Sequence, residues 1–316
     1  MSPFSPLIGQ PAAIELLTQA VARDRVAPAY LFAGPTGIGR SLAAECFLEL
    51  LLAKQSEPGR SQQSRIQQRN HPDLLWVEPT YLHQGKRLSA AETAAAGVKR
   101  KAAPLIRLEQ VREIARFLSR SPLEAPRSVV VLEQAETMAE AAANALLKTL
   151  EEPGQATLIL IAPGVESLLP TLVSRCQRIP FYRLSPEAMS QVLQQCGPPE
   201  LQQPEILQLA QGSPGAAIAH WQQLQAMPPE LLQQVTQRPR SVREALTLAR
   251  QIDKNLEAET QLWLIGYLQQ TYWQQLQIQP TVNPLPLRLL EQAREHLLHY
   301  VQPRLVWEVA LMGMVD

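Results

Sequence analysis

The eight residues Gly34-Pro-Thr-Gly-Ile-Gly-Arg-Ser41 decide the fold, because they match the spacing of a phosphate-binding loop, GxxxxGKS/T, at every position except the lysine. The apolar run Tyr30–Ala33 precedes this loop, and the helix-forming run Leu42–Ala53 follows it. Glycines let backbone N–H groups curl around phosphate oxygens, and the N-terminus of the following helix favours negative charge. Strand, loop and helix in this order predict a nucleotide site made by Gly34, Thr36, Gly37, Gly39, Arg40 and Ser41. The alternative is a glycine-rich turn that binds nothing.

Two positions of this site depart from the pattern of an active nucleotide hydrolase. Arg40 stands where a lysine would offer a compact charge to the β and γ phosphates, and a guanidinium is bulkier. The apolar run Val129–Leu132 ends in Glu133 and Gln134, where an acidic pair would hold magnesium and activate water. Glutamine cannot accept a proton, so the general-base position is empty. Ser41 offers a hydroxyl to magnesium, while Glu133 is either a magnesium ligand or a solvated carboxylate.

The N-terminal part of the chain alternates apolar runs with amphipathic helical runs, which predicts a parallel sheet covered on both faces. Residues 54–103 are polar and irregular and are predicted to form mostly a surface insertion. The apolar island Leu74–Val77 within them is interpreted as a strand. The other predicted elements are strands at Ser128–Leu132 and Thr157–Ile161 and helices at Pro11–Ala22, Leu108–Leu118 and Met138–Glu152.

The C-terminal part of the chain has a different pattern. Beyond Pro186 the residues are helical in periodicity and rich in leucine and glutamine. Met227, Pro228 and Pro229 make a continuous helix improbable and indicate a boundary. We therefore expect an α/β domain over residues 1–184, a small helical domain over 185–228 and an all-helical domain over 229–316.

The composition limits the classes of function. The 29 basic and 29 acidic residues cancel, so no field of the whole protein would attract nucleic acid or membrane, and any DNA contact must be local. Three cysteines without a CxxC pair argue against a disulfide framework and against a four-cysteine zinc site. The chain begins without an export signal and contains no run of about 18 apolar residues, so we expect a cytoplasmic protein without a membrane segment. The cluster Lys99–Lys101 is interpreted as solvated charge rather than a DNA contact.

Two further motifs carry a resemblance to a known family. Residues Ala143–Pro153 read ANALLKTLEEP, and Ser174-Arg-Cys176 follows them. Together with the phosphate-binding loop and His71-Pro-Asp73, they resemble bacterial clamp-loader subunits of the AAA+ class, and within that class the delta prime family of DNA polymerase III. The resemblance spans Leu7 to about Ala217. It implies an AAA+ P-loop domain with a parallel five-stranded sheet, a helical lid domain and a C-terminal collar domain that joins the subunits.

The resemblance also implies which functional groups are lost and which is kept. Ala162 and Pro163 stand where a sensor-one hydroxyl would be expected, and Gly215 stands where the sensor-two arginine of the ATPase subunits falls. With the changes in the loop and after the strand, these losses predict a chain that does not turn over ATP. Arg175 is intact, and in similar clamp loaders this arginine reaches the γ-phosphate of the neighbouring subunit, as an arginine finger in trans. The alternative is a surface arginine paired with a nearby carboxylate.

The resemblance implies partners as well. These are the gamma or tau ATPase subunits and delta in a hetero-pentamer, which sets the sliding clamp on primed DNA. The implied cofactor is ATP or ADP bound without turnover, and no zinc is expected, since Lys54–Asn70 lacks the four cysteines of related subunits. Two other functions stay open: an active AAA+ clamp-loader ATPase of the gamma or tau type, and a free-standing P-loop regulator that assembles with nothing.

Overall fold

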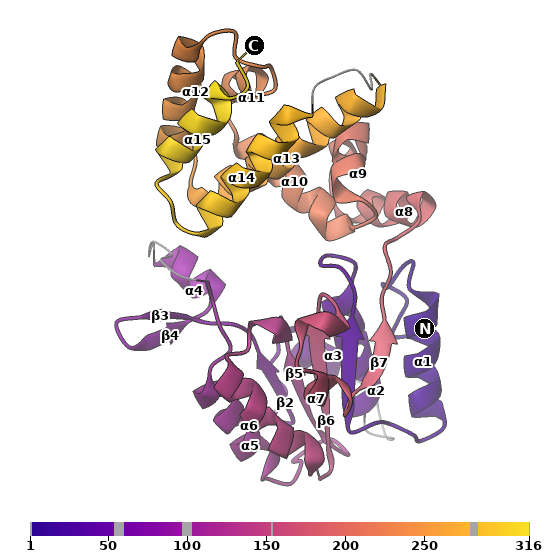
Figure 1. Ribbon diagram of the computed structural model, residues 1–316. Coiled ribbons are helices and arrows are strands. Elements are labelled where there is room, and N and C mark those ends of the chain that lie inside the picture. Colours follow the sequence, from indigo (N-terminus) through magenta and orange to yellow (C-terminus); the bar gives the residue numbers. More distant parts are fainter. Residues whose placement is uncertain (1, 54–59, 97–102, 153, 279–283, 316) are drawn as a thin grey trace. The chain divides into compact units, whose positions relative to one another are not determined.

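The computed structural model describes residues 2–53, 60–96, 103–152, 154–278 and 284–315 (Figure 1). Their internal contacts divide the chain into two compact units. Unit 1 comprises Met1–Cys196 and Gly212–Gly215, and unit 2 comprises Gly197–Gln211 and Ala216–Asp316. The division into three domains with boundaries near residues 184 and 228 stays a prediction.

Unit 1 is built on a parallel five-stranded sheet, which confirms the parallel sheet expected from the sequence and the five strands implied by the resemblance. The strand order is β2-β5-β6-β1-β7. β1 lies between β6 and β7, and its last residue, Ala33, pairs with Ala162 at the end of β6. Because the strands are parallel, their carboxyl ends meet at one edge of the sheet, where ligands of such folds bind. The bounds are β1 Ala29–Ala33, β2 Leu74–Val77, β5 Ser128–Leu132, β6 Ala156–Ala162 and β7 Gln177–Pro180.

Helices cover both faces of this sheet. On one face, Leu31, Val130 and Leu158 belong to an apolar cluster with α5, α6 and α7. On the other face, the rings of Tyr30 and Phe47 in α2 meet edge to face, with centroids 5.2 Å apart. Figure 1 shows α5 and α6 on one side of the sheet and α1 and α2 on the other. The bounds are α1 Pro11–Ala22, α2 Arg40–Leu52, α5 Leu108–Leu118, α6 Glu140–Glu151 and α7 Pro170–Val173.

The start of α6 differs from the prediction. The alanine-rich run indicated a helix from Met138, but the helix begins at Glu140. Residues Ala135–Thr137 form a short 3-10 turn, and Met138 makes a parallel β-bridge with Ile106. Helix propensity was therefore overridden by a tertiary contact that leaves Met138 extended.

The segment predicted to be a surface insertion, residues 54–103, contains helices and strands in the part that the structure describes, residues 60–96. β2 is the edge strand of the main sheet, which confirms the strand predicted at Leu74–Val77. An antiparallel hairpin, β3–β4, turns at Gln84 and Gly85, whose φ angles are 49° and 78°. The cluster Lys99–Lys101 lies outside the described residues. The bounds are α3 Arg60–Gln67, β3 Tyr81–His83, β4 Lys86–Leu88 and α4 Ala90–Ala95.

The segment before β2 is fixed to the neighbouring loop by one carboxylate. Asp73 is 2% exposed and accepts the backbone N–H groups of Leu123, Glu124 and Ala125 at 2.6, 2.7 and 2.7 Å. Burial favours the neutral acid, but the three N–H donors favour the carboxylate and hold the pKa of Asp73 below its usual value. Asp73 in turn donates its N–H to Nδ1 of His71. The His71-Pro-Asp73 motif therefore has a structural role at the edge of the sheet.

Unit 2 is helical throughout its described residues. Trp307 is fully buried in its core, where Nε1 donates to Oε1 of Gln261 at 2.8 Å, and Gln261 donates to the Leu256 carbonyl at 2.9 Å. These bonds satisfy polar groups that would otherwise be costly to bury. The helical character expected beyond Pro186 is confirmed. The helices are α8 Pro186–Cys196, which belongs to unit 1, α9 Pro204–Ala210, α10 Pro214–Ala226, α11 Pro229–Val235, α12 Val242–Asn255, α13 Ala258–Ile278, α14 Leu285–Leu298 and α15 Pro303–Met312.

Candidate functional site

The phosphate-binding loop connects β1 to α2 at the carboxyl edge of the sheet. Gly37 and Gly39 have φ angles of 79° and 97°, a conformation that glycine adopts without strain, and Gly39 is the N-cap of α2. A Cβ at Gly34 would lie 2.4 Å from the Phe181 carbonyl oxygen, so this position has no room for a side chain. None of the hydrogen bonds in the described residues uses the N–H of Gly37 or Gly39. These donors stay available to an anion at the helix N-terminus.

A hollow of about 370 Å³ lies beside this loop. It gathers residues from the loop, from α2 and from the ends of β5 and β6. Of the residues predicted for the nucleotide site, all except Gly34 line it. The lining residues are Thr36, Gly37, Gly39, Arg40, Ser41, Leu42, Glu133, Gln134, Glu136 and Ile161.

Arg40 fits within the loop in place of the usual lysine. It is 8% exposed, and its Nη2 lies 3.4 Å from Oγ1 of Thr36. Burial lowers the pKa of Arg40, and the charges of Glu136 and Glu133 act in the opposite direction. Its Nη1 is buried without a hydrogen-bond partner among the described residues. An unpaired guanidinium nitrogen is costly to bury, and an anion in the hollow would satisfy it.

Glu133 is held by three donors. The Ser41 hydroxyl donates to Oε1 at 2.8 Å, the Trp76 indole Nε1 donates to Oε2 at 2.9 Å, and Arg69 Nη2 lies 3.4 Å from Oε2. The Arg69 guanidinium also lies over the Trp76 ring, 4.1 Å from its centroid. A hydroxyl and a carboxylate oxygen in contact are the hard ligands that magnesium prefers. The sequence did not single out Trp76 and Arg69; the strand at Leu74–Val77, paired beside β5, was the only signal.

The two residues after Glu133 that line the hollow differ in chemistry. Gln134 is exposed, with a φ of 50°, and its amide cannot act as a base. Glu136 is half-buried, and its Oε2 has no hydrogen-bond partner among the described residues. Burial raises the pKa of Glu136, and the charge of Arg40 opposes that rise. Glu136 was missed by sequence reasoning because its position matched no expected ligand or base.

The start of α10 closes against the loop. Gly215 donates its N–H to the Gly37 carbonyl at 2.8 Å, and the Ser213 hydroxyl donates to the Thr36 carbonyl at 2.8 Å. A Cβ at Gly215 would lie 2.6 Å from Cα of Gly37. An arginine at this position would therefore force the two backbones apart. The contacts engage loop carbonyls and leave the N–H groups of Gly37 and Gly39 free.

Arg175 lies outside this hollow. It follows α7, and its side chain is 37% exposed. Its Nη2 contacts Oε1 of Glu151 at 2.7 Å, and its Nη1 donates to the Thr171 carbonyl at 3.0 Å. In this structure the guanidinium is thus paired with a surface carboxylate, as in the alternative interpretation of its role. Burial raises the pKa of the Cys176 thiol to about 11, which agrees with a packing role.

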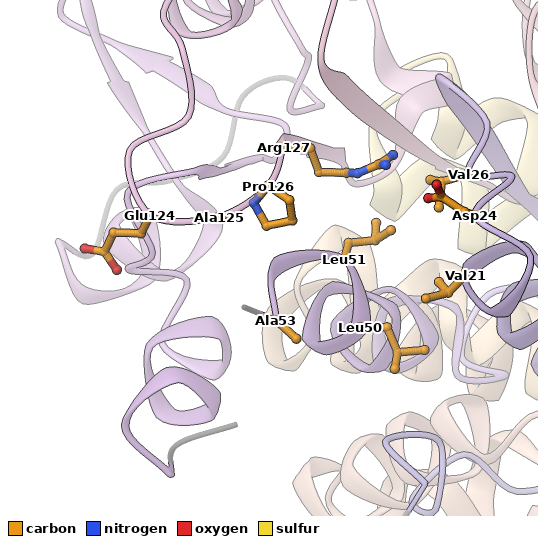
Figure 2. A pocket seen from close by; sticks show the side chains of 10 residues that line it. All are labelled: Val21, Asp24, Val26, Leu50, Leu51, Ala53, Glu124, Ala125, Pro126 and Arg127. Atoms are coloured by element: carbon orange, nitrogen blue, oxygen red, sulfur yellow. The ribbon is translucent and has the colours of Figure 1, made fainter. Parts of the chain in front are cut away.

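A larger hollow, of about 560 Å³, lies at the amino ends of β1 and β5. Figure 2 shows Leu51 of α2 and Pro126 of the loop before β5 facing it, while Glu124 points away. Its lining is mostly apolar, and it contains none of the predicted site residues. Residues 54–59, which follow Ala53 at its rim, lie outside the described part of the chain. The charged residues in its lining are Asp24, Glu124 and Arg127, and none of the lining residues comes from the phosphate-binding loop.

The described ranges contain neither a metal-binding cluster nor a helix that could span a membrane. Over the described ranges, no group of three or more His, Cys, Asp or Glu side chains is placed to hold a metal ion. The expectation that zinc is absent stays a prediction. No helix in those ranges has both the length and the apolar character needed to cross a membrane.

Comparison with solved structures supports the fold. A DNA polymerase III gamma subunit-related protein from Thermotoga maritima superposes with a TM-score of 0.53 at 16% sequence identity, over 94% of this chain and 96% of that chain. At this identity the likeness concerns the fold alone. It agrees with the parallel sheet and the helical C-terminal part described above.

Two curated relatives that share one subunit name are similar in sequence to this chain. DNA polymerase III subunit delta prime of Bacillus subtilis is 34% identical over 190 residues, 57% of this chain and 50% of the relative. The Pseudomonas aeruginosa subunit of the same name is 34% identical over 209 residues, 63% of this chain and 57% of the relative. The chain thus spans about half the length of the curated relatives it matches.

Family models extend the match along the chain. The model described as DNA polymerase III, delta subunit, matches residues 9–185. The model described as cyanobacterial DNA polymerase III delta prime, C-terminal domain, matches residues 187–314. Because these two matches cover both the P-loop part and the helical part, the chain belongs to the DNA polymerase III delta prime family.

Proposed function

We propose that this chain is a clamp-loader subunit of the DNA polymerase III holoenzyme that does not hydrolyse ATP itself and supplies Arg175 to a neighbouring ATPase subunit. The proposed partners are gamma or tau ATPase subunits and delta in a hetero-pentamer, which loads the sliding clamp onto primed DNA in the cytoplasm. Membership of the delta prime family supports the clamp-loader role. The non-hydrolysing role and the trans arginine are supported by the separate positions of the hollow at the phosphate-binding loop and of Arg175.

One observation carries this proposal: the chain holds two incomplete parts of a hydrolytic site in different places. The P-loop hollow contains Arg40 and Ser41, but Gln134 occupies the position of the base. Arg175 is exposed and does not line that hollow, so it cannot complete the chain's own site in this structure. A guanidinium that can reach outward suits stabilisation of charge on a nucleotide held by another subunit.

The same geometry supports a retained nucleotide. Phosphate oxygens would accept hydrogen bonds from the free N–H groups of Gly37 and Gly39 and from the unpaired Nη1 of Arg40. Magnesium would be held by Ser41 and Glu133. A bound phosphate would supply the hydrogen-bond acceptor that the buried Nη1 of Arg40 lacks. We expect ADP or ATP to be released when the purified chain is denatured. Absence of released nucleotide, together with no binding of a fluorescent ADP analogue, would contradict retention.

The trans role is tested in the assembled complex. Arg175→Ala should leave assembly intact and slow ATP hydrolysis at the adjacent ATPase subunit by roughly three to five orders of magnitude, the usual contribution of an arginine finger. Arg178→Ala is the matched control, because Arg178 is an exposed arginine on β7 three residues further on. Single-turnover hydrolysis at the neighbouring site is the measurement. An Arg175→Ala complex that hydrolyses ATP like the Arg178→Ala complex refutes the role.

A second candidate function is an active ATPase of the gamma or tau type, and Glu136 is the observation that favours it. Its unpaired Oε2, its position in the hollow and its raised pKa are properties of a proton acceptor. Magnesium-dependent hydrolysis by the isolated chain, abolished by Glu136→Gln, would establish this function. The first proposal predicts no such hydrolysis. Co-purification with clamp-loader subunits distinguishes both from a free-standing regulator.

A further inference from the structure

The C-terminal end of α6 carries negative charges, which are unfavourable at that end of a helix. Glu151 is the last residue of the helix and Glu152 is its C-cap, although the C-terminus of a helix favours cations. Nearby carbonyl groups already concentrate negative charge there. A carboxylate at this end therefore costs stability unless a cation compensates it. Lys148 lies in the same last turn, and Arg175 contacts the carboxylate directly, with Nη2 2.7 Å from Oε1 of Glu151.

The guanidinium of Arg175 is fixed from two sides. Nη1 donates to the carbonyl of Thr171 in α7, and Nη2 is bound by the carboxylate at the end of α6. A planar fork held at two corners has a defined direction, whereas an exposed arginine with a single anchor samples several rotamers. Since 37% of the side chain is exposed, the remaining N–H groups can still meet a ligand from outside.

We propose that Glu151 is a positioning residue for Arg175, which orients the guanidinium for the nucleotide of the neighbouring subunit. This inference rests on the trans role proposed above. Glu151 itself touches no substrate. By holding the Arg175 side chain in one orientation beforehand, it reduces the conformational entropy that this side chain loses in the transition state of phosphoryl transfer. The opposite possibility is that the carboxylate competes with phosphate for Arg175. The two predict opposite changes in rate when Glu151 is removed.

The test uses the complex reconstituted with its gamma or tau subunits, and measures kcat and KM for ATP. Because exposed ion pairs are weak, Glu151→Ala should lower kcat by about two- to five-fold without raising KM. Glu151→Gln keeps an oxygen that can accept the N–H of Arg175 and should restore most of the rate. Glu152→Ala is the matched control, since Glu152 is an exposed neighbour with no ion pair among the described residues. Mass photometry checks that every complex has assembled equally.

A double substitution separates this inference from the trans role. Glu151→Ala should have no further effect in an Arg175→Ala background, because both changes then remove the same interaction. If Arg175→Ala itself leaves the rate unchanged, the trans role fails and the inference falls with it. If Arg175→Ala slows the complex while Glu151→Ala behaves like Glu152→Ala, only the positioning role is overturned. A faster Glu151→Ala complex would also overturn it, in favour of competition.

Discussion

Replacing Gly215 by alanine should destabilise the protein, although alanine is the better helix former. The added Cβ would lie 2.6 Å from Cα and 3.1 Å from the carbonyl oxygen of Gly37. Both are backbone atoms, so the segments must separate, at a cost of about 1–3 kcal/mol for overpacking. Separation also weakens the hydrogen bond from Gly215 to Gly37, worth about 1 kcal/mol. Alanine recovers up to about 1 kcal/mol of helix propensity, so the net loss is about 1–3 kcal/mol.

Gly266 provides a control at which alanine should change the free energy of unfolding in the opposite direction. It lies inside α13, and a Cβ there would meet no atom within 4 Å. Gly266→Ala should therefore stabilise unit 2 by about 1 kcal/mol through helix propensity alone. The same substitution thus has opposite effects at two helical glycines. The difference arises from the contact with Gly37.

The assay combines urea unfolding followed by far-UV circular dichroism with hydrogen exchange of individual peptides. Exchange localises the effect, because the two units need not unfold together. Gly215→Ala should speed exchange in the peptide that contains Gly34–Ser41 and leave peptides of α13 unchanged. Equal stability of the Gly215→Ala and wild-type proteins, with unchanged exchange in the loop, would refute the close contact of these two glycines.

Two further predictions follow from single residues. Asp73→Asn should lower the free energy of unfolding at neutral pH by about 2–4 kcal/mol, because an amide cannot replace a carboxylate that accepts the N–H groups of residues 123–125. Since the pKa of Asp73 is lowered in the fold, this stabilisation is present above about pH 4 and is lost as the pH falls through the folded-state pKa. Unfolding free energies measured at decreasing pH should therefore converge for the wild-type and Asp73→Asn proteins. Cys176, with a pKa of about 11, should react with iodoacetamide at pH 8 far more slowly than the exposed Cys196, as peptide mass spectrometry would measure; equal rates would contradict the burial of Cys176.

The strand-loop-helix core could be predicted from the sequence because its signals are local. A β-branched run such as Ser128–Leu132 indicates a buried strand by itself, and the spacing from Gly34 to Ser41 defines a P-loop without any distant contact. Leu108–Leu118 was predicted with the bounds that the structure shows, because its apolar residues recur at helical spacing. In each case the pattern and the fold agree within a short window of sequence.

The residues that surround the site could not be predicted in the same way, because their roles depend on pairing between distant segments. Trp76 reaches Glu133 only because β2 lies next to β5. Arg69 has a φ of 56°, unusual for a residue other than glycine, and nothing in the sequence indicates it. The β3–β4 hairpin was missed because each strand has only three residues, too few for an alternating pattern.

The hydrogen bond between Trp76 and Glu133 limits how this protein can be shortened. A truncation that removed the whole of residues 54–103 would also delete an edge strand of the sheet and two of the three donors to Glu133, Trp76 and Arg69. A deletion that preserves the site must leave the segment from Arg69 to Glu78 in place. Substitutions in that stretch, although distant from Ser41 along the chain, are expected to alter the position of Glu133 beside the phosphate-binding loop.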